Sequence, residues 1–181
     1  MGKIIAIVGI DGSGKSTLIE RLNVESTHFY SNVKGSNKTT NSNGKKNKFF
    51  SEFKFLVGTF LKIYIPNFYK VLKFRFLSKK NLFYDRYTYD YLILLKHKRT
   101  FFRDILYLFF YYFPQPTHLV CLNVNPEVSF QRKKEFDVEY LKNRQDKLIK
   151  TINKVNPKRV KFFDSSVNVN LPYDYLKQLL S

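Results

Sequence analysis

The sequence predicts an α/β fold, a three-layer sandwich in which a mostly parallel, five-stranded sheet is flanked by helices. Apolar runs typical of buried strands recur along the chain, and segments with helical spacing separate them. The first apolar run leads straight into a glycine-rich turn. Strands that alternate with helices favour parallel crossovers with helices on both faces of the sheet. A chain of 181 residues is expected to form one domain of ordinary size.

The expected strands are short. Residues 3–8, "KIIAIV", form a run that is apolar after Lys3 and that Gly9 closes, which is the pattern of a strand buried on both faces of a parallel sheet. The other expected strands lie at 27–30, 82–85, 118–124 and 159–164. Because parallel strands end at one edge of a sheet, the residues that follow them are candidates for a shared site.

Helical spacing fills most of the chain between these strands. Helices are expected over about 15–24, 49–63, 86–95, 101–113, 126–135, 138–155 and 172–180. Pro66 is expected to bend or end the second of these, with another helix beginning near Asn67. Asn125 and Asp137 have the side chains that cap helix N-termini.

A polar loop interrupts this pattern at about residues 31–48. It contains five Asn, five Lys, no acidic residue and hardly any apolar side chain that could anchor it. A segment of this composition cannot bury enough apolar surface to offset the entropy of ordering it. We therefore expect the loop to be mobile when no ligand is bound.

The composition limits the class of protein and its surroundings. Cys121 is the only cysteine, which excludes an intramolecular disulfide and favours a reducing compartment. The first residues enter a strand-like run without the successive regions of a signal peptide. The longest aromatic run, at 101–113, is too short for a membrane span and carries Arg103 and Asp104. We expect a cytoplasmic protein.

The chain is strongly basic, with 32 Lys and Arg against 14 Asp and Glu, and a net charge of +18. Such a charge favours polyanionic partners, namely nucleoside triphosphates, nucleic acid or an anionic membrane surface. No RNA-binding signature or zinc-ligand spacing accompanies it, so nucleic acid is not the expected partner. Peripheral contact with an anionic membrane stays open. So does a compositional origin, because abundant Lys, Asn, Ile, Phe and Tyr without Trp is typical of an AT-rich genome.

The glycine-rich turn "GIDGSGKST" carries the strongest functional signal. Its residues fit the pattern G-x-x-x-x-G-K-[ST] between an expected strand and an expected helix, which is the context of a P-loop. In a P-loop, backbone N–H groups surround phosphate oxygens, the lysine contacts the terminal phosphates and the hydroxyl ligates Mg²⁺. The sequence therefore predicts a site for Mg-ATP. The predicted nucleotide-binding residues are Gly9, Asp11, Gly12, Ser13, Gly14, Lys15, Ser16 and Thr17.

Asp85 ends the expected strand "LFYD", which would place its carboxylate at the edge of the sheet beside the phosphates. P-loop proteins need such a second carboxylate to hold the metal or orient the acceptor, so Ser16 and Asp85 are the predicted metal-site residues. Arg86 follows at once and is suited to gripping a phosphate or stabilising transition-state charge. The alternatives are a solvated Asp85 and a surface Arg86 that pairs with Asp85 or Asp90.

A third group of cations lies in "QRKKEFDVEYLKNRQ". Arg132, Lys133, Lys134 and Arg144 fall on two helical pieces with a break near Phe136. This arrangement suits a lid, at about residues 132–144, that brings positive charge over the triphosphate. A plain solvated basic face is the alternative.

In this order, "GIDGSGKST", "YDRYTYD" and "NVNPEVSFQRKKE" resemble the thymidylate kinase superfamily of P-loop small-molecule kinases, and the likeness covers most of the chain. The resemblance implies that Asp85 is the metal-side carboxylate, that Arg86 holds an acceptor phosphate and that Asp11 approaches an acceptor hydroxyl. It also implies a catalytic arginine from the lid, which is best matched by Arg132, and makes a homodimer plausible. The predicted catalytic residues are Lys15, Asp85, Arg86 and Arg132.

The departures from that family concern the acceptor. Thymidylate kinases carry a T-R-E-P-G segment where this chain has the polar loop, and a serine and a base-reading glutamine after Asp-Arg-Tyr that "TYDYLILLKHKR" lacks. "DRYTYD", "KHKR" and "RKKE" instead look similar to thymidylate-kinase-like proteins encoded among polysaccharide-synthesis genes. The leading expectation is transfer of the ATP γ-phosphoryl to a small anionic acceptor such as a sugar or sugar phosphate, with basic residues 96–99 nearby. Thymidylate kinase is the first alternative, and a nucleotide-dependent switch without a small acceptor is the second.

Overall fold

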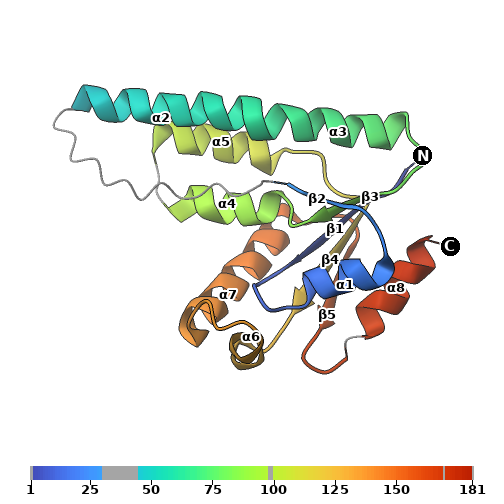
Figure 1. The fold of residues 1–181 in the computed structure, drawn as a ribbon. Helices are drawn as coiled ribbons and strands as arrows, with labels where there is room; N and C mark the ends of the chain where they lie inside the picture. The colour runs from blue at the N-terminus through green and yellow to red at the C-terminus, as the bar shows by residue number, and fades with distance from the viewer. Residues whose placement is uncertain (1, 30–44, 98–99, 169, 181) are drawn as a thin grey trace.

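The computed structural model describes residues 2–29, 45–97, 100–168 and 170–180. Its strands form one sheet in the order β2-β3-β1-β4-β5, in which every pairing is parallel (Figure 1). The strands are β1 (Ile4–Gly9), β2 (Ser26–His28), β3 (Leu82–Asp85), β4 (His118–Asn123) and β5 (Val160–Asp164). The expected five-stranded α/β sandwich is thus confirmed.

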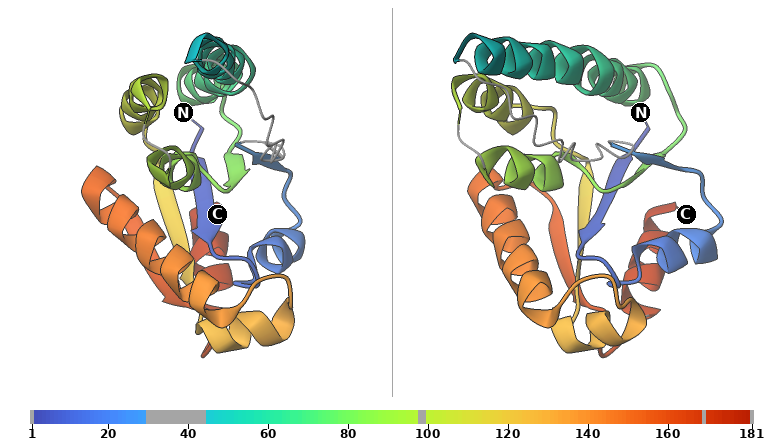
Figure 2. Two further views of the ribbon diagram at one scale, coloured as in Figure 1. Left: turned by 90° about the vertical axis from the view of Figure 1, so that its left-hand side faces the viewer. Right: turned by 60° about the vertical axis from the view of Figure 1, so that its left-hand side comes forward.

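Helices cover both faces of this sheet (Figures 1 and 2). On one face lie α1 (Lys15–Leu22) and α8 (Asn170–Leu180), whose apolar residues join those of β1 and β4. The opposite face is covered by α3 (Ile65–Phe76), α4 (Thr88–His97), α5 (Phe101–Tyr111) and α7 (Val138–Val155). The short α6 (Pro126–Arg132) follows β4 and leads into α7.

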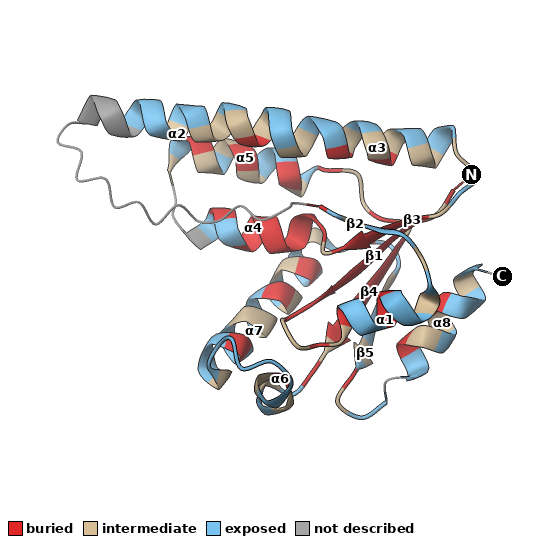
Figure 3. Ribbon diagram, viewed as in Figure 1, coloured by how far each residue is buried: buried red, intermediate tan, exposed pale blue. Residues whose placement is uncertain are grey.

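The central strand, β1, explains why one continuous apolar run predicts a parallel sheet. Each of its residues is buried, and its neighbours in the sheet are β3 and β4 (Figure 3). Because helices cover both faces of this strand and other strands pair with both of its edges, none of its side chains faces water. Its sequence is therefore apolar throughout and does not alternate between apolar and polar residues. In the β1–β3 ladder, Ile7 stands opposite Asp85, which brings the end of β3 level with the end of β1.

Both expected helix caps are present. The Asn125 side chain accepts a hydrogen bond from the Glu127 N–H at 2.9 Å, ahead of α6. The Asp137 side chain accepts from the Tyr140 N–H at 2.6 Å, ahead of α7. Each satisfies one of the backbone donors that a helix N-terminus leaves without a partner.

The expectation that Pro66 bends or ends a helix needs correction. α2 (Lys45–Thr59) continues through η1 (Phe60–Tyr64), a π-helical turn, into α3, and together they form one long rod (Figure 1). Pro66 lies in the first turn of α3, and the Ile65 N–H bonds the Phe60 carbonyl five residues back. A proline lacks the N–H that an α-helix needs, and the wider π turn lets the chain pass it without a break.

The polar loop expected at 31–48 falls mostly outside the described residues. Its last four residues differ from the expectation, because α2 already begins at Lys45. The helix predicted over 86–95 begins only at Thr88, and the helix predicted over 126–135 ends at Arg132.

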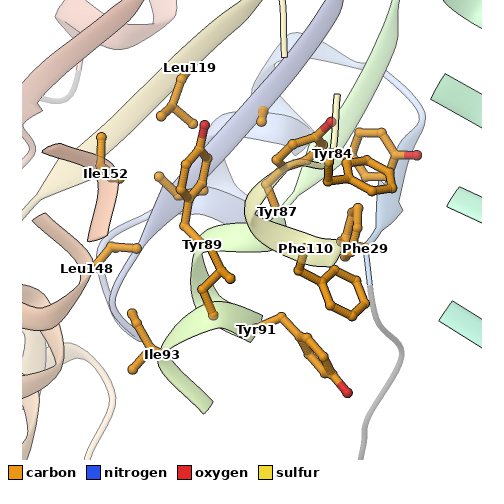
Figure 4. Close-up of a cluster of buried hydrophobic side chains, with 14 of the residues drawn as sticks. Phe29, Tyr84, Tyr87, Tyr89, Tyr91, Ile93, Phe110, Leu119, Leu148 and Ile152 are labelled. Carbon is orange, nitrogen blue, oxygen red and sulfur yellow. The ribbon is translucent and has the colours of Figure 1, made fainter. Parts of the chain in front are cut away.

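Buried aromatic rings fill the space between the sheet and the helices α4 and α5 (Figure 4). Phe29, Tyr84 and Tyr87 form a chain of tilted and edge-on ring contacts with centroids 5.1–5.8 Å apart. Such geometries add to the apolar area that the rings bury.

Every tyrosine hydroxyl in this cluster has a partner, as buried polar groups require. Tyr87 donates to the Pro114 carbonyl at 2.6 Å, and Tyr89 donates to the Gln115 side chain at 2.8 Å. Tyr84 and Tyr91 reach the rod instead, at Asn67 and Thr59 respectively. The tyrosines of "YDRYTYDY" are therefore core residues.

Across the part of the chain that the structure describes, no helix combines the length and the apolarity needed to cross a membrane.

Candidate active site

The glycine loop connects β1 to α1, as the motif predicts. Gly14 has φ +89° at the N-cap of α1, and Gly12 has φ +79°. A Cβ on Gly12 would lie 2.7 Å from Ser129 Oγ and 2.8 Å from the Ser129 carbonyl oxygen, so α6 leaves room only for glycine there. Backbone freedom and close approach both account for these glycines.

Lys15 is buried, and its ammonium points back to the loop. Nζ donates to the Gly9 carbonyl at 2.9 Å, to the Ile10 carbonyl at 2.7 Å and to Ser13 Oγ at 3.3 Å. Burial and the charge of Arg86 lower the pKa of Lys15 to about 8, against the opposing effect of three carboxylates. The ammonium of Lys15 is poorly solvated, and its present acceptors include two neutral carbonyl groups. An anionic acceptor would form stronger hydrogen bonds with it.

Ser16 and Thr17 have exposed side chains in the first turn of α1. Their hydroxyls therefore lie at the helix N-terminus, where backbone N–H groups and the helix dipole favour anions. Ser13, in contrast, is fully buried. The predicted nucleotide-binding residues thus form one loop in which Ser13 supports the turn and Ser16 is accessible.

Asp85 ends β3 at the sheet edge, as predicted. It is 7% exposed, and its Oδ1 atom is buried without a hydrogen-bond partner among the residues that the structure describes. Oδ2 lies 3.6 Å from Nδ1 of His28, the residue that stands opposite Asp85 in the β2–β3 ladder. A buried carboxylate oxygen without a donor is costly in a folded chain, so this atom is a candidate for a ligand or metal contact.

Arg86 has a left-handed backbone, with φ +69°. Non-glycine residues rarely adopt this conformation, and such strain is concentrated at functional sites. The Arg86 N–H bonds the Ile7 carbonyl at 2.9 Å, which fixes the turn after β3 against β1. The turn directs the guanidinium to Asp11 of the glycine loop, with Nη2 and Oδ1 2.5 Å apart.

This contact joins the two predicted motifs, which are 75 residues apart. Burial works against the charged form of Asp11, but Arg86 and, more weakly, Lys15 and Lys133 hold the pKa of Asp11 below its ordinary value. Asp11 is therefore a carboxylate at neutral pH. The alternative of a solvated Asp85 is wrong, and Arg86 pairs with the glycine loop.

The structure adds Asp90 to the site, which sequence reasoning considered only as a surface partner of Arg86. Asp90 is 1% exposed, and its Oδ1 lies 3.5 Å from Arg86 Nη1 and 3.0 Å from Arg144 Nη2. One buried carboxylate thus joins the turn after β3 to α7. The spacing of four residues from Arg86 on a helix was the available signal, whereas Arg144 is 54 residues away in the chain.

The cations of the predicted lid fall into three groups. Arg132 donates to the Gly12 carbonyl at 3.4 Å and to the Ser165 carbonyl at 3.3 Å, so it lies over the glycine loop. Arg144 faces Asp90. Lys133 and Lys134 are exposed, and Lys133 pairs with Glu135 at 3.2 Å. The two helical pieces predicted on either side of Phe136 are α6 and α7.

The basic residues expected near the acceptor are farther along α4. Lys96 is exposed in the last turn, about 12 Å along the helix from Thr88 at 1.5 Å per residue. Residues 98–99 lie outside the described residues. Among those described, no group of three or more His, Cys, Asp or Glu is placed to hold a metal ion by itself.

The fold and the loop define the chain as a P-loop α/β protein with a nucleoside kinase fold. No protein-family model matches the sequence, and no curated protein does. Solved structures of deoxyadenosine kinase from M. mycoides do match. At 17–18% identity, this likeness concerns the fold.

The three structures carry different nucleotides. The one with bound dATP has a TM-score of 0.55 and 17% identity, over 97% of this chain and 98% of that chain. The one with the products dCMP and a flexible dCDP has a TM-score of 0.59 and 18% identity, over 98% of both chains. The one with bound dCTP has a TM-score of 0.56 and 17% identity, again over 98% of both.

Proposed function

We propose that this protein is a phosphotransferase that moves the γ-phosphoryl group of Mg-ATP to a small acceptor. The observation that carries the proposal is the contact between its two motifs. In the sheet, Asp85 stands opposite Ile7 near the end of β1, where the glycine loop that holds Lys15 begins. The ion pair between Arg86 and Asp11 joins the turn after β3 to the same loop. A loop that only binds nucleotide has no need of this second set of charges.

The residues that would hold Mg-ATP fit that task. Loop N–H groups and the Lys15 ammonium would bind the phosphates, and Ser16, with an accessible hydroxyl, would hold Mg²⁺ together with Asp85. The unpartnered oxygen of Asp85 and the exposed Ser16 are the observations that favour this pair. Bound Mg²⁺ would neutralise charge that develops on the phosphate oxygens.

In the proposed step, an acceptor oxygen bonds to the γ-phosphorus and the bond to the bridging oxygen of ADP breaks. Arg86 would stabilise the transferring group or an acceptor phosphate, and Arg132 would act from the other side of the loop. If the acceptor is a hydroxyl, Asp85 or Asp11 would receive its proton. We assign residues 132–144 as a lid within a single kinase domain that spans the chain.

The acceptor has two candidate classes. Positive charge from Arg86 and Arg144 at the sheet edge supports an anionic acceptor, such as a sugar phosphate. A neutral deoxynucleoside is the second candidate. It is favoured because Asp11 and Asp90 already compensate the charge of Arg86, and because the similar solved structures are of a deoxyadenosine kinase.

The test is an assay of ADP release from Mg-ATP with a panel of acceptors at equal concentration. The panel holds deoxynucleosides, nucleoside monophosphates including thymidylate, sugars and sugar phosphates. At least one acceptor is expected to accelerate ADP release and to appear phosphorylated by mass spectrometry. Thymidylate is expected to be poor, because the chain lacks the base-reading glutamine that could hydrogen-bond its base.

The matched control is Lys147→Ala, an exposed lysine on α7 whose loss should leave the rate unchanged. Lys15→Ala should remove the acceptor-dependent rate. Tight ATP binding with no acceptor-dependent turnover across the whole panel would contradict the proposal and support a nucleotide-dependent switch.

A further inference from the structure

Asp90 lies in the first turn of α4, where this helix meets α7. Three residues further along, Ile93 belongs to the same buried apolar cluster as Leu148 and Ile152 of α7 (Figure 4). Arg144 precedes Leu148 by four residues and therefore lies on the same side of α7. The pair of Asp90 and Arg144 thus continues an apolar contact between the two helices, and that contact does not depend on the charge of Asp90.

The carboxylate of Asp90 faces two guanidinium groups. Its Oδ1 accepts a hydrogen bond from Arg144 Nη2 at 3.0 Å and lies 3.5 Å from Arg86 Nη1. Its Oδ2 is buried and has no hydrogen-bond partner within the described part of the chain. Because a buried carboxylate oxygen without a donor is costly, Asp90 is able to accept a closer contact from Arg86.

The two carboxylates beside Arg86 differ in their access to solvent. The side chain of Asp11 is 27% exposed, whereas the side chain of Asp90 is 2% exposed. A phosphate group at the glycine loop would compete with Asp11 for Arg86, because Asp11 belongs to that loop. It would not compete with Asp90, whose carboxylate is enclosed. Of these two contacts of Arg86, the one with Asp11 is exchangeable and the one with Asp90 is permanent.

We propose that Asp90 is a positioning residue, which holds the Nη1 side of the Arg86 guanidinium while the Nη2 side exchanges Asp11 for a phosphate oxygen of the substrate. Asp90 would keep Arg86 directed at the loop during this exchange, and its contact with Arg86 would shorten as the contact with Asp11 is lost. Arg144, at the end of the assigned lid, shares Oδ1 of Asp90 and so links the position of Arg86 to α7. This inference rests on the proposed function, since the exchange serves phosphoryl transfer.

The first test is Asp90→Asn, assayed with an acceptor of the panel that the original chain phosphorylates. The amide keeps the size of the side chain and removes the charge that holds Arg86 against the pull of Asp11. The value of kcat is expected to fall by a factor on the order of ten to a hundred. The Kd of Mg-ATP, measured by calorimetry, should change less than about threefold, because the glycine loop and Lys15 keep their places.

Leu148→Ala is the matched control, because it loosens the same contact between α4 and α7 without changing a charge. This variant should unfold at a lower temperature and keep the original kcat. An equal loss of kcat in Leu148→Ala would give Asp90 a purely structural role and overturn the proposal. Parallel losses of kcat and of ATP affinity in Asp90→Asn would do the same.

A second variant separates positioning from stability. Asp90→Asn leaves the charge of Arg144 beside a neutral amide, and the combination of Asp90→Asn with Arg144→Gln removes that charge as well. The combination should unfold at a higher temperature than Asp90→Asn alone. Its kcat should stay as low, because Arg86 still lacks its anchor. Recovery of kcat together with stability would contradict the proposal.

A double-mutant cycle tests the anchor without turnover. The free energy of unfolding is measured for Asp90→Asn, for Arg86→Gln and for the variant with both changes. If Asp90 holds Arg86, the loss in the double variant is smaller than the sum of the single losses. Additive losses in a chain that phosphorylates an acceptor would overturn this inference alone. No turnover by the original chain with any acceptor would instead overturn the proposed function.

Discussion

The two faces of the sheet are packed with different kinds of side chain. The face under α1 and α8 is mostly aliphatic, with Ile5, Ile7 and Leu176 buried together. The face under α4 and α5 is aromatic, with rings such as Phe29 and Phe110 in contact. The aliphatic face carries the helix that starts at the glycine loop, whereas the aromatic face holds α4 and the rod in place.

The difference indicates which substitutions should change turnover and which should change the free energy of unfolding. Residues at the carboxyl edge, including Lys15 and Asp85, are buried polar groups that contribute desolvation cost as well as contacts. The aromatic residues are buried apolar area with satisfied hydroxyls, which is the dominant source of stability. Changes at the edge should therefore alter turnover, and changes in the rings should alter unfolding.

Lys15→Ala should have the largest effect and abolish detectable phosphoryl transfer. The free energy of unfolding should change little, because the lost hydrogen bonds are offset by removing a charge from a site that disfavours it. Turnover and chemical denaturation measure the two quantities. Activity near that of the original chain would show that the loop does not act as a P-loop.

Phe110→Ala should have the opposite signature, with a loss of about 3–5 kcal/mol in the free energy of unfolding. Phe110 is fully buried and contacts the rings of Phe29, Tyr64 and Tyr91. Tyr112→Ala, at a 76% exposed position in the turn that follows α5, is the matched control and should cost less than about 0.5 kcal/mol. Similar losses in both variants would show that burial in the ring cluster is not the source of the stability that Phe110 contributes.

Asp85→Asn should lower turnover by a factor on the order of a hundred, with a smaller loss of ATP affinity. The amide keeps the shape of the side chain but lacks the charge with which Asp85 is proposed to hold the metal and to act in the transition state. Asp146→Asn, an exposed acid on α7, is the control. If both variants turn over at the original rate, Asp85 has a structural role only.

Tyr87→Phe should have the smallest effect, about 1 kcal/mol of stability, with turnover unchanged. The substitution removes one hydroxyl, which donates to the Pro114 carbonyl, and keeps the ring in its cluster. Burial raises the pKa of Tyr87 well above its ordinary value, so this donor is present throughout the neutral range. Tyr69→Phe, on the exposed face of the rod, should be neutral by the same denaturation measurement.

Much of the fold could be predicted because buried parallel strands appear in the sequence as short, continuous apolar runs. The run at 3–8 and the strand observed at Ile4–Gly9 differ by one residue, since no polar position interrupts a strand covered on both faces. The start of the helix after β3 could not be predicted in this way. Nothing in the sequence marks Arg86 for a left-handed backbone, which is set by its contacts with Ile7 and Asp11.

The candidate site shows the same limit. Spacing predicts the loop around Lys15, and the position of Asp85 at a strand end predicts that both reach one edge. The pairing of Asp90 with Arg144 depends on how α7 packs against α4. A single sequence contains no signal for a contact between two surface-compatible residues on separate helices, so this part of the site required the structure.

The π-helical turn in the rod has a consequence for how the chain can vary. Thr59 and Asn67 both face inward, to Tyr91 and Tyr84, although eight residues of regular α-helix would rotate them about 80° apart. The additional residue of the π turn cancels most of this rotation. Removing one residue between 60 and 64 would convert the π turn into regular α-helix and leave Asn67 facing nearly the same way, because seven residues of α-helix rotate by only about 20° less than two full turns. Inserting one residue there would instead turn α3 by about 100° and carry Asn67 away from its partners, so the rod should tolerate a deletion in the π turn better than an insertion.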